Sequence, residues 1–167
     1  GQRCDEKDSP ITAAETPGEI RIPGNNVFLE DWDNPKATGE SFKDGWFCTG
    51  DVAVLEDDYY RIMGRSSVDI IKSGGYKLSA LEIEGVLLTH EAIAEVAVIG
   101  VADDTWGEAV TAFVALKPAS SLDYERLKNW CEGKMSSYKI PKALKFVEAL
   151  PRNAMGKVTK PALHELL

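Results

Sequence analysis

The segment that most constrains this chain is GRSSVDIIKSGGYK, residues 64–77, because the pattern of the sequence changes across it. Before it, short apolar stretches are separated by turn residues, which is typical of strands and loops. After it, β-branched runs alternate with helical patterns. The segment also holds a double glycine, Gly74-Gly75. Glycine permits positive φ and close approach of another group. The pair is therefore either an ordinary hairpin turn or a place where the backbone meets a ligand.

Composition excludes several classes of function. The chain has 167 residues, 44% of them hydrophobic, which is enough core for one domain or two small ones. With 19 basic and 27 acidic residues its net charge is −8, so we expect neither nucleic acid nor an anionic membrane as the main partner. No apolar run approaches the roughly 18 residues of a membrane span.

The three cysteines, Cys4, Cys48 and Cys131, show no spacing typical of metal ligands or of a disulfide framework. We therefore expect no metal site and a reducing intracellular compartment, either the mitochondrial matrix or the cytosol. The start, GQRCDEKDSP, is polar and does not look like a signal peptide. Because this start is abrupt, we expect the chain to be a piece of a longer one.

The part before the central segment is expected to be rich in strands and turns. Residues 1–17 show no periodicity and are predicted to be a flexible lead-in. Residues 18–64 begin with the alternating strand GEIRI, and Pro35 could open a brief helix that reaches Phe42. The stretch GDVAVLEDDYYRIMGR predicts a hairpin whose turn lies at Glu56-Asp57-Asp58.

The part after the central segment predicts a small α+β domain. Strands 69–72 and 76–78 flank the glycine turn, and Ser79 with Glu82 forms a capping box that starts a helix to about His90. We expect Leu81, Val86, Leu87 and Leu88 on its apolar side. The runs AEVAVIGVAD and EAVTAFVALK predict two central strands. Further elements are a helix near 123–136 with Leu127, Trp130 and Cys131 inward, a strand in ALKFVEAL, and a helix from about Pro161 to Leu167.

Two residues at the hairpin suggest binding of a polar ligand. Asp51 follows Gly50 at the start of a strand, and its two carboxylate oxygens suit a vicinal diol such as a ribose. Arg65 offers a planar fork of donors for hydroxyl or phosphate oxygens. The two hairpin strands could bring both residues to one edge. The competing interpretations are a turn-capping aspartate and a surface ion pair.

A second group of candidates lies further along the chain. Lys157, in PRNAMGKV, resembles a phosphate-binding lysine, but the Ser/Thr and leading glycine of a P-loop are absent. Trp106 lies in a turn between two strands, and Tyr138 precedes several lysines, so their rings could stack on an adenine while the cations meet phosphates. A solvated lysine and a core tryptophan are the alternatives.

Taken together, the segments resemble the adenylate-forming superfamily of acyl-CoA synthetases, luciferases and peptide-synthetase adenylation domains. The resemblance covers about residues 18 to 167, in order: GEIRIPGNNVFLEDWDNP, DGWFCTGD, YYRIMGRSSVDIIKSGGYKLSALEIE, VAVIGVADDTWGEAVTAFV and LPRNAMGK. Within the superfamily, SVDIIKSGGYKLSALEIE and LPRNAMGK are most similar to the malonyl-CoA synthetase group, including the acyl-CoA synthetase family member 3 type.

The resemblance implies a domain organisation. Residues 18–64 would be the β-rich end of a large N-terminal adenylation domain, and residues 69–167 a small mobile lid domain with a mixed sheet flanked by helices. Residues 65–68 would be the hinge, placed at Ser66, Ser67 and Val68. Relatives usually have a charged hinge residue, whereas this chain is one residue longer there and uncharged before Asp69.

The resemblance also implies roles for single residues. Asp51 and Arg65 would bind the nucleotide, and Lys157 would be the catalytic lysine that bridges carboxylate and phosphate oxygens. Gly74 and Gly75 would line the tunnel that holds the pantetheine arm of CoA. Four other side chains would contact the nucleotide part of CoA. These are Trp106 and Tyr138, with Lys77 and Lys142 as weaker candidates for its phosphates.

The implied reaction joins a small carboxylic acid to CoA with ATP, through an acyl-adenylate, and the acid is malonate or another short-chain acid by resemblance alone. Magnesium would accompany ATP, although no residue identified in this chain would bind it. The missing N-terminal domain would be the main partner, so the fragment alone should be inactive. Two alternatives remain open: an adenylation enzyme with a carrier-protein thiol as acceptor, and a non-catalytic lid-like interaction module.

Overall fold

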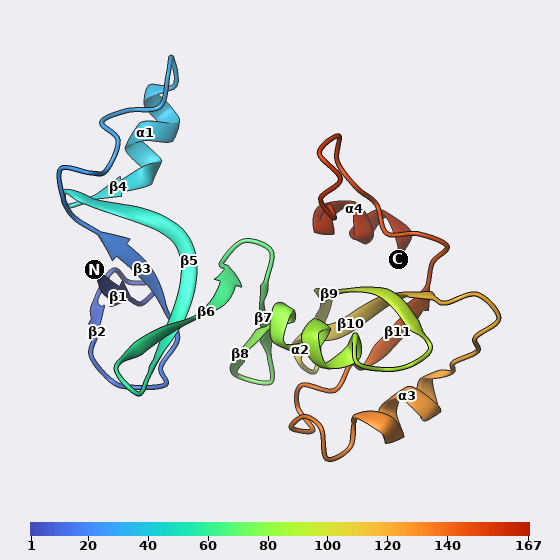
Figure 1. The fold of residues 1–167 in the computed structure, drawn as a ribbon. Coiled ribbons are helices and arrows are strands. Elements are labelled where there is room, and N and C mark those ends of the chain that lie inside the picture. The colour runs from blue at the N-terminus through green and yellow to red at the C-terminus, as the bar shows by residue number, and fades with distance from the viewer. The chain divides into compact units, whose positions relative to one another are not determined.

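The computed structural model describes all 167 residues, and these form two compact units, Gly1–Ser67 and Val68–Leu167 (Figure 1). The boundary falls between Ser67 and Val68, inside the segment that we predicted to be a hinge. That this segment bends stays a prediction, and the two units are described separately below. No helix in the chain is long and apolar enough to cross a membrane.

The first unit is an antiparallel sheet with one short helix. The strands follow the order β2 (Pro10–Ile11), β1 (Gln2–Cys4), β3 (Gly18–Ile22), β5 (Trp46–Glu56) and β4 (Phe42–Lys43), and β6 (Tyr59–Arg65) pairs with β5. Helix α1 (Pro35–Ser41) begins at the expected proline, and the side chain of Asn34 caps it by accepting a hydrogen bond from the Ala37 amide at 3.0 Å. The predicted hairpin is present as β5 and β6, and Glu56 pairs with Tyr59 across its turn.

The first seventeen residues contain regular structure, which differs from the flexible lead-in that we expected. Strand β1 pairs with both β2 and β3. The side chain of Arg3 is only 2% exposed, and its guanidinium donates to the backbone oxygens of Ala13 at 2.8 Å and Thr16 at 2.6 Å. These bonds satisfy the donors of a buried guanidinium and hold the loop that follows β2. The periodicity of the sequence predicts neither the burial of Arg3 nor the position of this loop.

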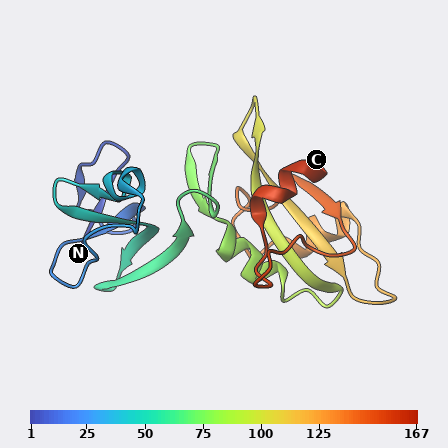
Figure 2. The same cartoon turned by 90° about the horizontal axis from the view of Figure 1, so that it is seen from above.

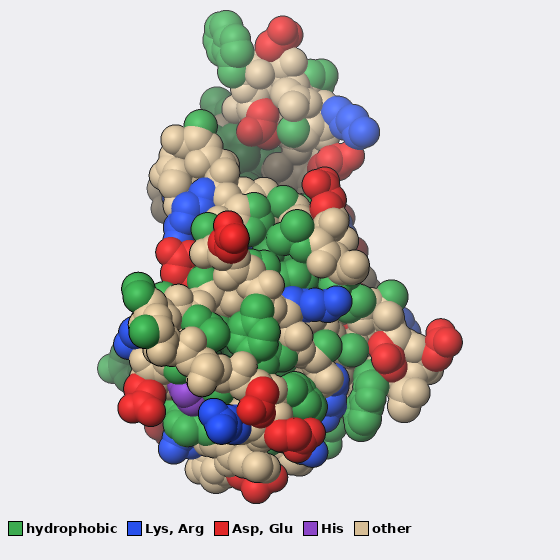
Figure 3. All heavy atoms as spheres, turned by 90° about the vertical axis from the view of Figure 1, so that its right-hand side faces the viewer, with side chains coloured by type: hydrophobic (Ala, Val, Ile, Leu, Met, Phe, Trp, Pro, Cys, Tyr) green, Lys and Arg blue, Asp and Glu red, His purple; other side chains and the backbone are tan.

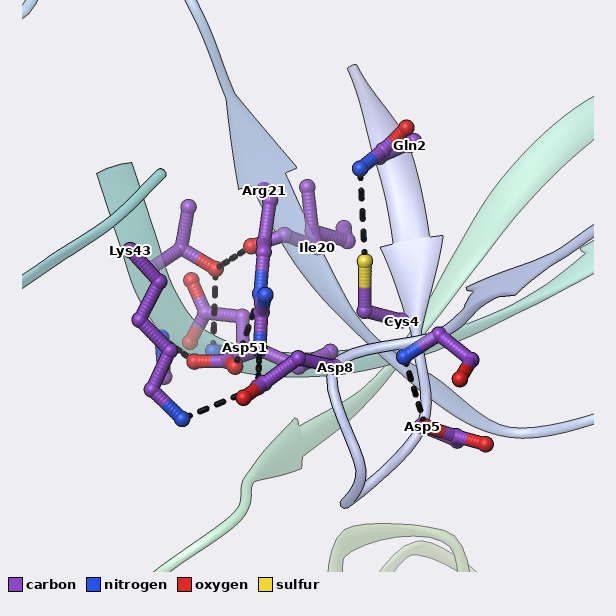
Figure 4. Close-up of polar contacts among 12 residues, drawn as sticks. Gln2, Cys4, Asp5, Asp8, Ile20, Arg21, Lys43 and Asp51 are labelled. Atoms are coloured by element: carbon purple, nitrogen blue, oxygen red, sulfur yellow. Dashed lines mark hydrogen bonds and ion pairs between the residues drawn. The ribbon is translucent and has the colours of Figure 1, made fainter. Parts of the chain in front are cut away.

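A buried arginine also ties the N-terminal loop to β3. Arg21 is 4% exposed and forms an ion pair with Asp8, which in turn accepts a hydrogen bond from Lys43 at 2.9 Å. Figure 4 shows Asp8 between the two cations. The polar residues of the lead-in therefore form part of the folded unit.

The second unit is a mixed sheet flanked by helices, as expected (Figures 1 and 2). The sheet follows the order β11 (Ala143–Phe146), β10 (Gly107–Leu116), β7 (Ile70–Ser73) and β8 (Tyr76–Ser79), and β9 (Ile93–Asp103) also pairs with β10. The pair β10 and β11 is parallel, and the other pairs are antiparallel. The helices are α2 (Ala80–Leu87), α3 (Tyr124–Cys131) and α4 (Lys160–Leu163), followed by the 3-10 turn η1 (His164–Leu166).

The two faces of this sheet pack against different helices. Val98 of β9 and Val110 of β10 contact the cluster that includes α2 and α3, whereas Ile99 and Phe113 point to the other face and pack with Leu163 of α4. This alternation follows the period of two in a strand, and it explains why both runs are continuously apolar. Figure 1 shows α4 and α3 on opposite sides of the sheet.

The helices of the second unit are shorter than predicted. Helix α2 ends at Leu87, and the residues that it buries are Ala80, Ile83 and Leu87, whereas the expected Leu81 and Leu88 are 45% and 50% exposed. Helix α3 ends at Cys131, because Glu132 leaves the helical conformation with a ψ of 130° and Gly133 has a φ of 77°. The predicted Ser79 cap is confirmed, since its side chain accepts a hydrogen bond from the Glu82 amide at 3.2 Å.

Candidate functional site

In the first unit, Asp51 and Arg65 lie directly opposite each other on the paired strands β5 and β6. Arg65 Nε is 3.0 Å from Asp51 Oδ1, and Arg65 Nη1 donates to the Thr49 backbone oxygen at 2.8 Å. The side chains of Arg65 and Asp51 are 60% and 37% exposed, so both can still reach a ligand. The hairpin therefore brings these two predicted residues to one edge.

The backbone next to Asp51 is held by several hydrogen bonds. The Thr49 hydroxyl donates to the Ile20 backbone oxygen at 2.7 Å and accepts from the Asp51 amide at 3.1 Å. Glu19 accepts from the Gly50 amide at 3.0 Å. Gly50 has a φ of 74°, and a Cβ placed there would lie 3.1 Å from Arg65 Nη1. Glycine therefore leaves room for the Arg65 guanidinium beside β5, and this arrangement orients the Asp51 carboxylate before any ligand binds.

In the second unit, Gly74 and Gly75 are the two central residues of the turn between β7 and β8. Their φ values of 58° and 83° are those of a tight hairpin turn with positive φ at both positions. The hairpin interpretation is therefore correct, and the turn also meets another element. The Gly74 amide donates to the Trp106 backbone oxygen at 2.9 Å, and a Cβ at Gly74 would lie 3.3 Å from the Trp106 ring. Around Gly75 the space is open.

The remaining predicted CoA residues gather around this turn. Lys142 holds its ammonium group 4.8 Å from the centre of the Trp106 ring, within the range of a cation–π contact. Tyr138 stacks on Tyr76, which directly follows Gly75, with ring centroids 4.6 Å apart. Lys77 follows Tyr76 on β8. Trp106 and Tyr138 are 40% and 37% exposed, so these aromatic rings form part of an accessible surface with lysines beside it.

Lys157 lies in a different part of the second unit, in the loop before α4. The loop is closed by a bridge between Arg152 and Val158. Asn153 stiffens it, because its side-chain oxygen accepts from the amides of Met155 and Lys157, both at 3.0 Å. The Lys157 side chain is exposed and its ammonium group makes no hydrogen bond or ion pair within the chain. A flexible cation on a stiff loop is suited to meet an anionic ligand.

The Lys157 loop and the glycine turn belong to different faces of the second unit. Leu150 and Val158, which flank the loop, pack with Phe113 on the face covered by α4. Ile71 and Leu78, which flank the glycine turn on β7 and β8, pack in the cluster with α2 and α3. The structure therefore does not bring Lys157 and Gly74-Gly75 into one site within this unit.

The distribution of charged side chains and of possible metal ligands also limits which ligands this chain can bind. On the face drawn in Figure 3, Lys and Arg side chains lie among Asp and Glu side chains and do not form one continuous basic patch. No group of three or more His, Cys, Asp or Glu side chains comes together to hold a metal ion. The residues of this chain therefore do not fit a magnesium site by themselves.

Sequence reasoning missed several residues that shape the site. Tyr76 was not singled out, although its position after a double glycine places it on the same turn. Glu19, which holds the Gly50 amide, lies on a separate strand, so no local signal pointed to it. Lys160 was also missed, and it contacts Asp69 at 2.6 Å across 91 residues of sequence.

Comparison with known proteins identifies the family. Residues 82–157 match the model of the AMP-binding enzyme C-terminal domain. The second unit therefore contains the C-terminal domain of AMP-binding enzymes. The match begins in α2 and ends at Lys157, so it covers most of the second unit. The resemblance found from the motifs is confirmed.

Individual AMP-binding enzymes match nearly the whole chain. The mitochondrial malonate–CoA ligase ACSF3 of Bos taurus is 51% identical over 158 residues, which cover 93% of this chain and 27% of that protein. Malonate–CoA ligase of Arabidopsis thaliana is 47% identical over 162 residues, covering 90% of this chain and 27% of the relative. ATP-bound MatB from Rhodopseudomonas palustris is 34% identical with a TM-score of 0.84, covering 99% of this chain and 33% of that structure.

The chain thus spans about a quarter to a third of the length of these AMP-binding enzymes. Both curated relatives are named as CoA ligases, which does not favour a carrier-protein thiol as acceptor or a non-catalytic module. The α+β fold class that we predicted for the second unit is confirmed by the structural match.

Proposed function

We propose that this chain is the C-terminal part of an ATP-dependent acyl-CoA synthetase, which we call the parent enzyme. In the first half-reaction a carboxylate oxygen attacks the α-phosphorus of ATP, which gives an acyl-adenylate and releases diphosphate. In the second, the thiol of CoA attacks the acyl carbon, forms the thioester and releases AMP. The similarity to named CoA ligases over about 90% of the chain supports this proposal.

The observation that carries the proposal most directly is the surface formed by Gly74-Gly75, Trp106, Lys142 and Tyr138. These residues are far apart in sequence, yet the Gly74 turn contacts Trp106, and Lys142 lies over its ring. Accessible aromatic faces can stack on the adenine of CoA, and the lysines can pair with its phosphates. The turn itself lacks side chains that would obstruct the pantetheine arm.

In this proposal, Asp51 and Arg65 bind the nucleotide. The Asp51 carboxylate can accept hydrogen bonds from both ribose hydroxyls, and Arg65, paired to it at 3.0 Å, orients it. Magnesium, if it accompanies ATP, would be held by the phosphates and by residues outside this chain, because no ligand group comes together here. No step of this proposal depends on a metal bound by these residues.

Lys157 acts in the first half-reaction in this proposal. Its ammonium group would bridge a substrate carboxylate oxygen and an α-phosphate oxygen, and so stabilise the negative charge that accumulates in the transition state. The exposed position on a stiff loop supports this role. The acid would be malonate or another short-chain acid, since two relatives are named malonate–CoA ligases.

The two half-reactions require different faces of the second unit, so we propose that this unit turns about the hinge between them. The backbone is anchored on both sides of the hinge. The Ser66 amide donates to the Gly50 oxygen at 2.9 Å in the first unit, and the Asp69 oxygen accepts from the Ala80 amide at 2.8 Å in the second. The dihedral change therefore falls on Ser66, Ser67 and Val68, with Ser67 and Val68 free of these anchors.

The compartment of the parent enzyme follows from its relatives by inference. The Bos taurus relative is named as mitochondrial, which supports a mitochondrial location over a cytosolic one. Fractionation of cells with an antibody against this chain tests the assignment, and enrichment in the cytosol would contradict it.

Separate measurement of the half-reactions in the parent enzyme tests the proposed function. Lys157→Ala should lower adenylation, measured as exchange of labelled diphosphate into ATP, by about 100-fold or more, as expected for loss of a preorganised cation. Thioester formation from a preformed acyl-adenylate should change little. Lys145→Ala, an exposed lysine on β11, is the matched control. Equal loss of both half-reactions would contradict the role of Lys157, and a parent enzyme without adenylation would contradict the function.

A further inference from the structure

Lys160 lies at the centre of a buried ion network in the second unit. Its Nζ is 2.6 Å from Asp69 Oδ1 and 2.8 Å from Glu84 Oε1. The three side chains are between 11% and 13% exposed. Glu84 Oε1 also accepts a hydrogen bond from the Val98 amide of β9 at 2.7 Å. The network therefore joins the segment before β7, helix α2, strand β9 and helix α4.

The network links the end of the predicted hinge to the end of the Lys157 loop. Asp69 is the first residue after the predicted hinge, and Lys160 is the first residue of α4, three positions after Lys157. Helix α4 has four residues, too few to hold its own orientation through backbone hydrogen bonds alone. Its position depends on tertiary contacts, which are the buried Leu163 and the ion pairs of Lys160.

The Lys157 loop is stiff within itself, so its direction is decided at its base. Arg152 donates to the Gly156 oxygen and to Glu95, both at 2.8 Å, and the Thr159 amide donates to the Pro151 oxygen at 2.8 Å. The bonds within the loop fix its shape, and the bond to Glu95 ties it to β9. The two ion pairs of Lys160 then link the end of the loop to the end of the hinge.

We propose that Lys160 is a positioning residue for adenylation, which transmits the turn at the hinge to Lys157 as a rigid-body movement. This inference rests on the proposed function. The ion pair with Asp69 joins the base of the Lys157 loop directly to the residue where the hinge ends, and the pair with Glu84 prevents α4 from sliding along β9. Without these bonds the loop keeps its shape and its bond to Glu95 of β9, but it loses the direct link to the residue where the hinge ends.

The second half-reaction does not need this connection. The glycine turn continues from Asp69 through β7, and β7 pairs with both β8 and β10. Ile71 and Leu78 of these strands are buried in the main core. The position of Gly74-Gly75 relative to the hinge is therefore set by the sheet, and Lys160 should affect the two half-reactions unequally.

Buried charges also favour a role in orientation. Removing charged groups from water costs free energy that the ion pairs only partly return, and apolar replacements of similar size often leave stability unchanged or increase it. One cation shared by two carboxylates that are only 11% and 13% exposed therefore suggests a requirement for fixed geometry.

Three variants of the parent enzyme test the inference: Lys160→Met, Lys160→Arg, and the neutral triple variant Lys160→Met/Asp69→Asn/Glu84→Gln. Lys160→Met should lower the adenylation rate by about 100-fold, since a displacement of about 1 Å at a reacting group has an effect of this size. Thioester formation from preformed acyl-adenylate should stay within about twofold of wild type. Lys160→Arg, which keeps the charge, should recover most of the adenylation. Lys145→Met on β11 is the matched control.

The triple variant separates positioning from folding, because it leaves no uncompensated carboxylate and should fold even if Lys160→Met does not. Its far-ultraviolet circular dichroism and thermal midpoint are measured beside both activities. A folded triple variant with normal adenylation would overturn the inference, and so would an equal fall of both half-reactions in any folded variant. A wild-type parent enzyme unable to make the acyl-adenylate would overturn the proposed function instead.

Discussion

The rings of Tyr76 and Tyr138 stack with their centroids 4.6 Å apart and their planes 11° from parallel. Tyr76 follows the glycine turn on β8, and Tyr138 lies in the loop between α3 and β11. Tyr76 is 55% exposed and Tyr138 is 37% exposed, so the pair presents aromatic surface to solvent beside Gly75. The stack therefore joins two distant segments at the surface proposed for CoA.

The first prediction concerns Tyr138. Replacement by Ala in the parent enzyme should raise the KM for CoA about tenfold, because stacking of a base on an aromatic ring contributes about 1–3 kcal/mol. The KM for ATP should not change. Steady-state kinetics with each substrate varied in turn provide the measurement. Tyr59→Ala, which removes an 80% exposed tyrosine on β6, is the control, and a similar rise in both KM values would argue against the assignment.

The second prediction concerns the glycine turn. Gly75→Val should abolish thioester formation and leave adenylation nearly intact, because a branched side chain would enter the path of the thiol. Gly133→Val is a matched control, since both glycines have positive φ, 83° and 77°, and open space around the added carbon. Both variants should lose about 1–2 kcal/mol of stability from the left-handed backbone. If Gly75→Val retains full turnover, the turn does not line the tunnel.

The third prediction concerns Asp51. Asp51→Asn should raise the KM for ATP by about tenfold or more, since a hydrogen bond to a charged group contributes about 1.5–3 kcal/mol. The KM for CoA should stay unchanged. Asp58→Asn, an exposed residue in the turn of the same hairpin, is the control. An unchanged KM for ATP would mean that the pair of Asp51 and Arg65 only stabilises the hairpin.

The fourth prediction concerns the pH dependence of the first unit. Hydrogen bonds from Arg21 and Lys43 lower the pKa of Asp8 below its ordinary value of 3.8. A carboxyl group whose pKa is lower in the folded state stabilises that state above its unfolded pKa, and this contribution disappears as the pH falls through the folded pKa. The first unit should therefore lose stability to acid below about pH 4.

Asp8→Asn tests this directly, because Asn also tolerates the φ of 65° at this position. The variant should be less stable at neutral pH and should show a flatter acid dependence. Urea midpoints between about pH 2 and pH 6 can be followed by fluorescence after Trp106 and Trp130 of the second unit are replaced by Phe. An acid dependence identical to that of the unsubstituted protein would show that Asp8 contributes nothing to it.

Local chemistry determined much of the fold in advance. Asp57-Asp58 and Gly74-Gly75 adopt the positive φ that their hairpin turns require, and Asn34 and Ser79 cap their helices with their own side chains. These features depend on interactions between residues only a few positions apart, so they can be predicted from the local sequence. The pairing of Asp51 with Arg65 was only partly predictable, because the turn alone would place Asp51 opposite Gly64. A register shift between Val52 and Ala53 places it opposite Arg65 instead.

Only the tertiary structure decided which distant residues meet. Arg3 is buried because the carbonyls of Ala13 and Thr16 receive its guanidinium, and no periodicity in a polar segment predicts that. Lys160 meets Asp69, and Lys142 meets Trp106, through strand order and packing against the sheet. Such contacts gain their energy from burial and from groups brought together by the whole fold. The sequence by itself therefore determined the turns, the caps and the family motifs, whereas the fold decided that Lys160, three residues after Lys157, meets Asp69.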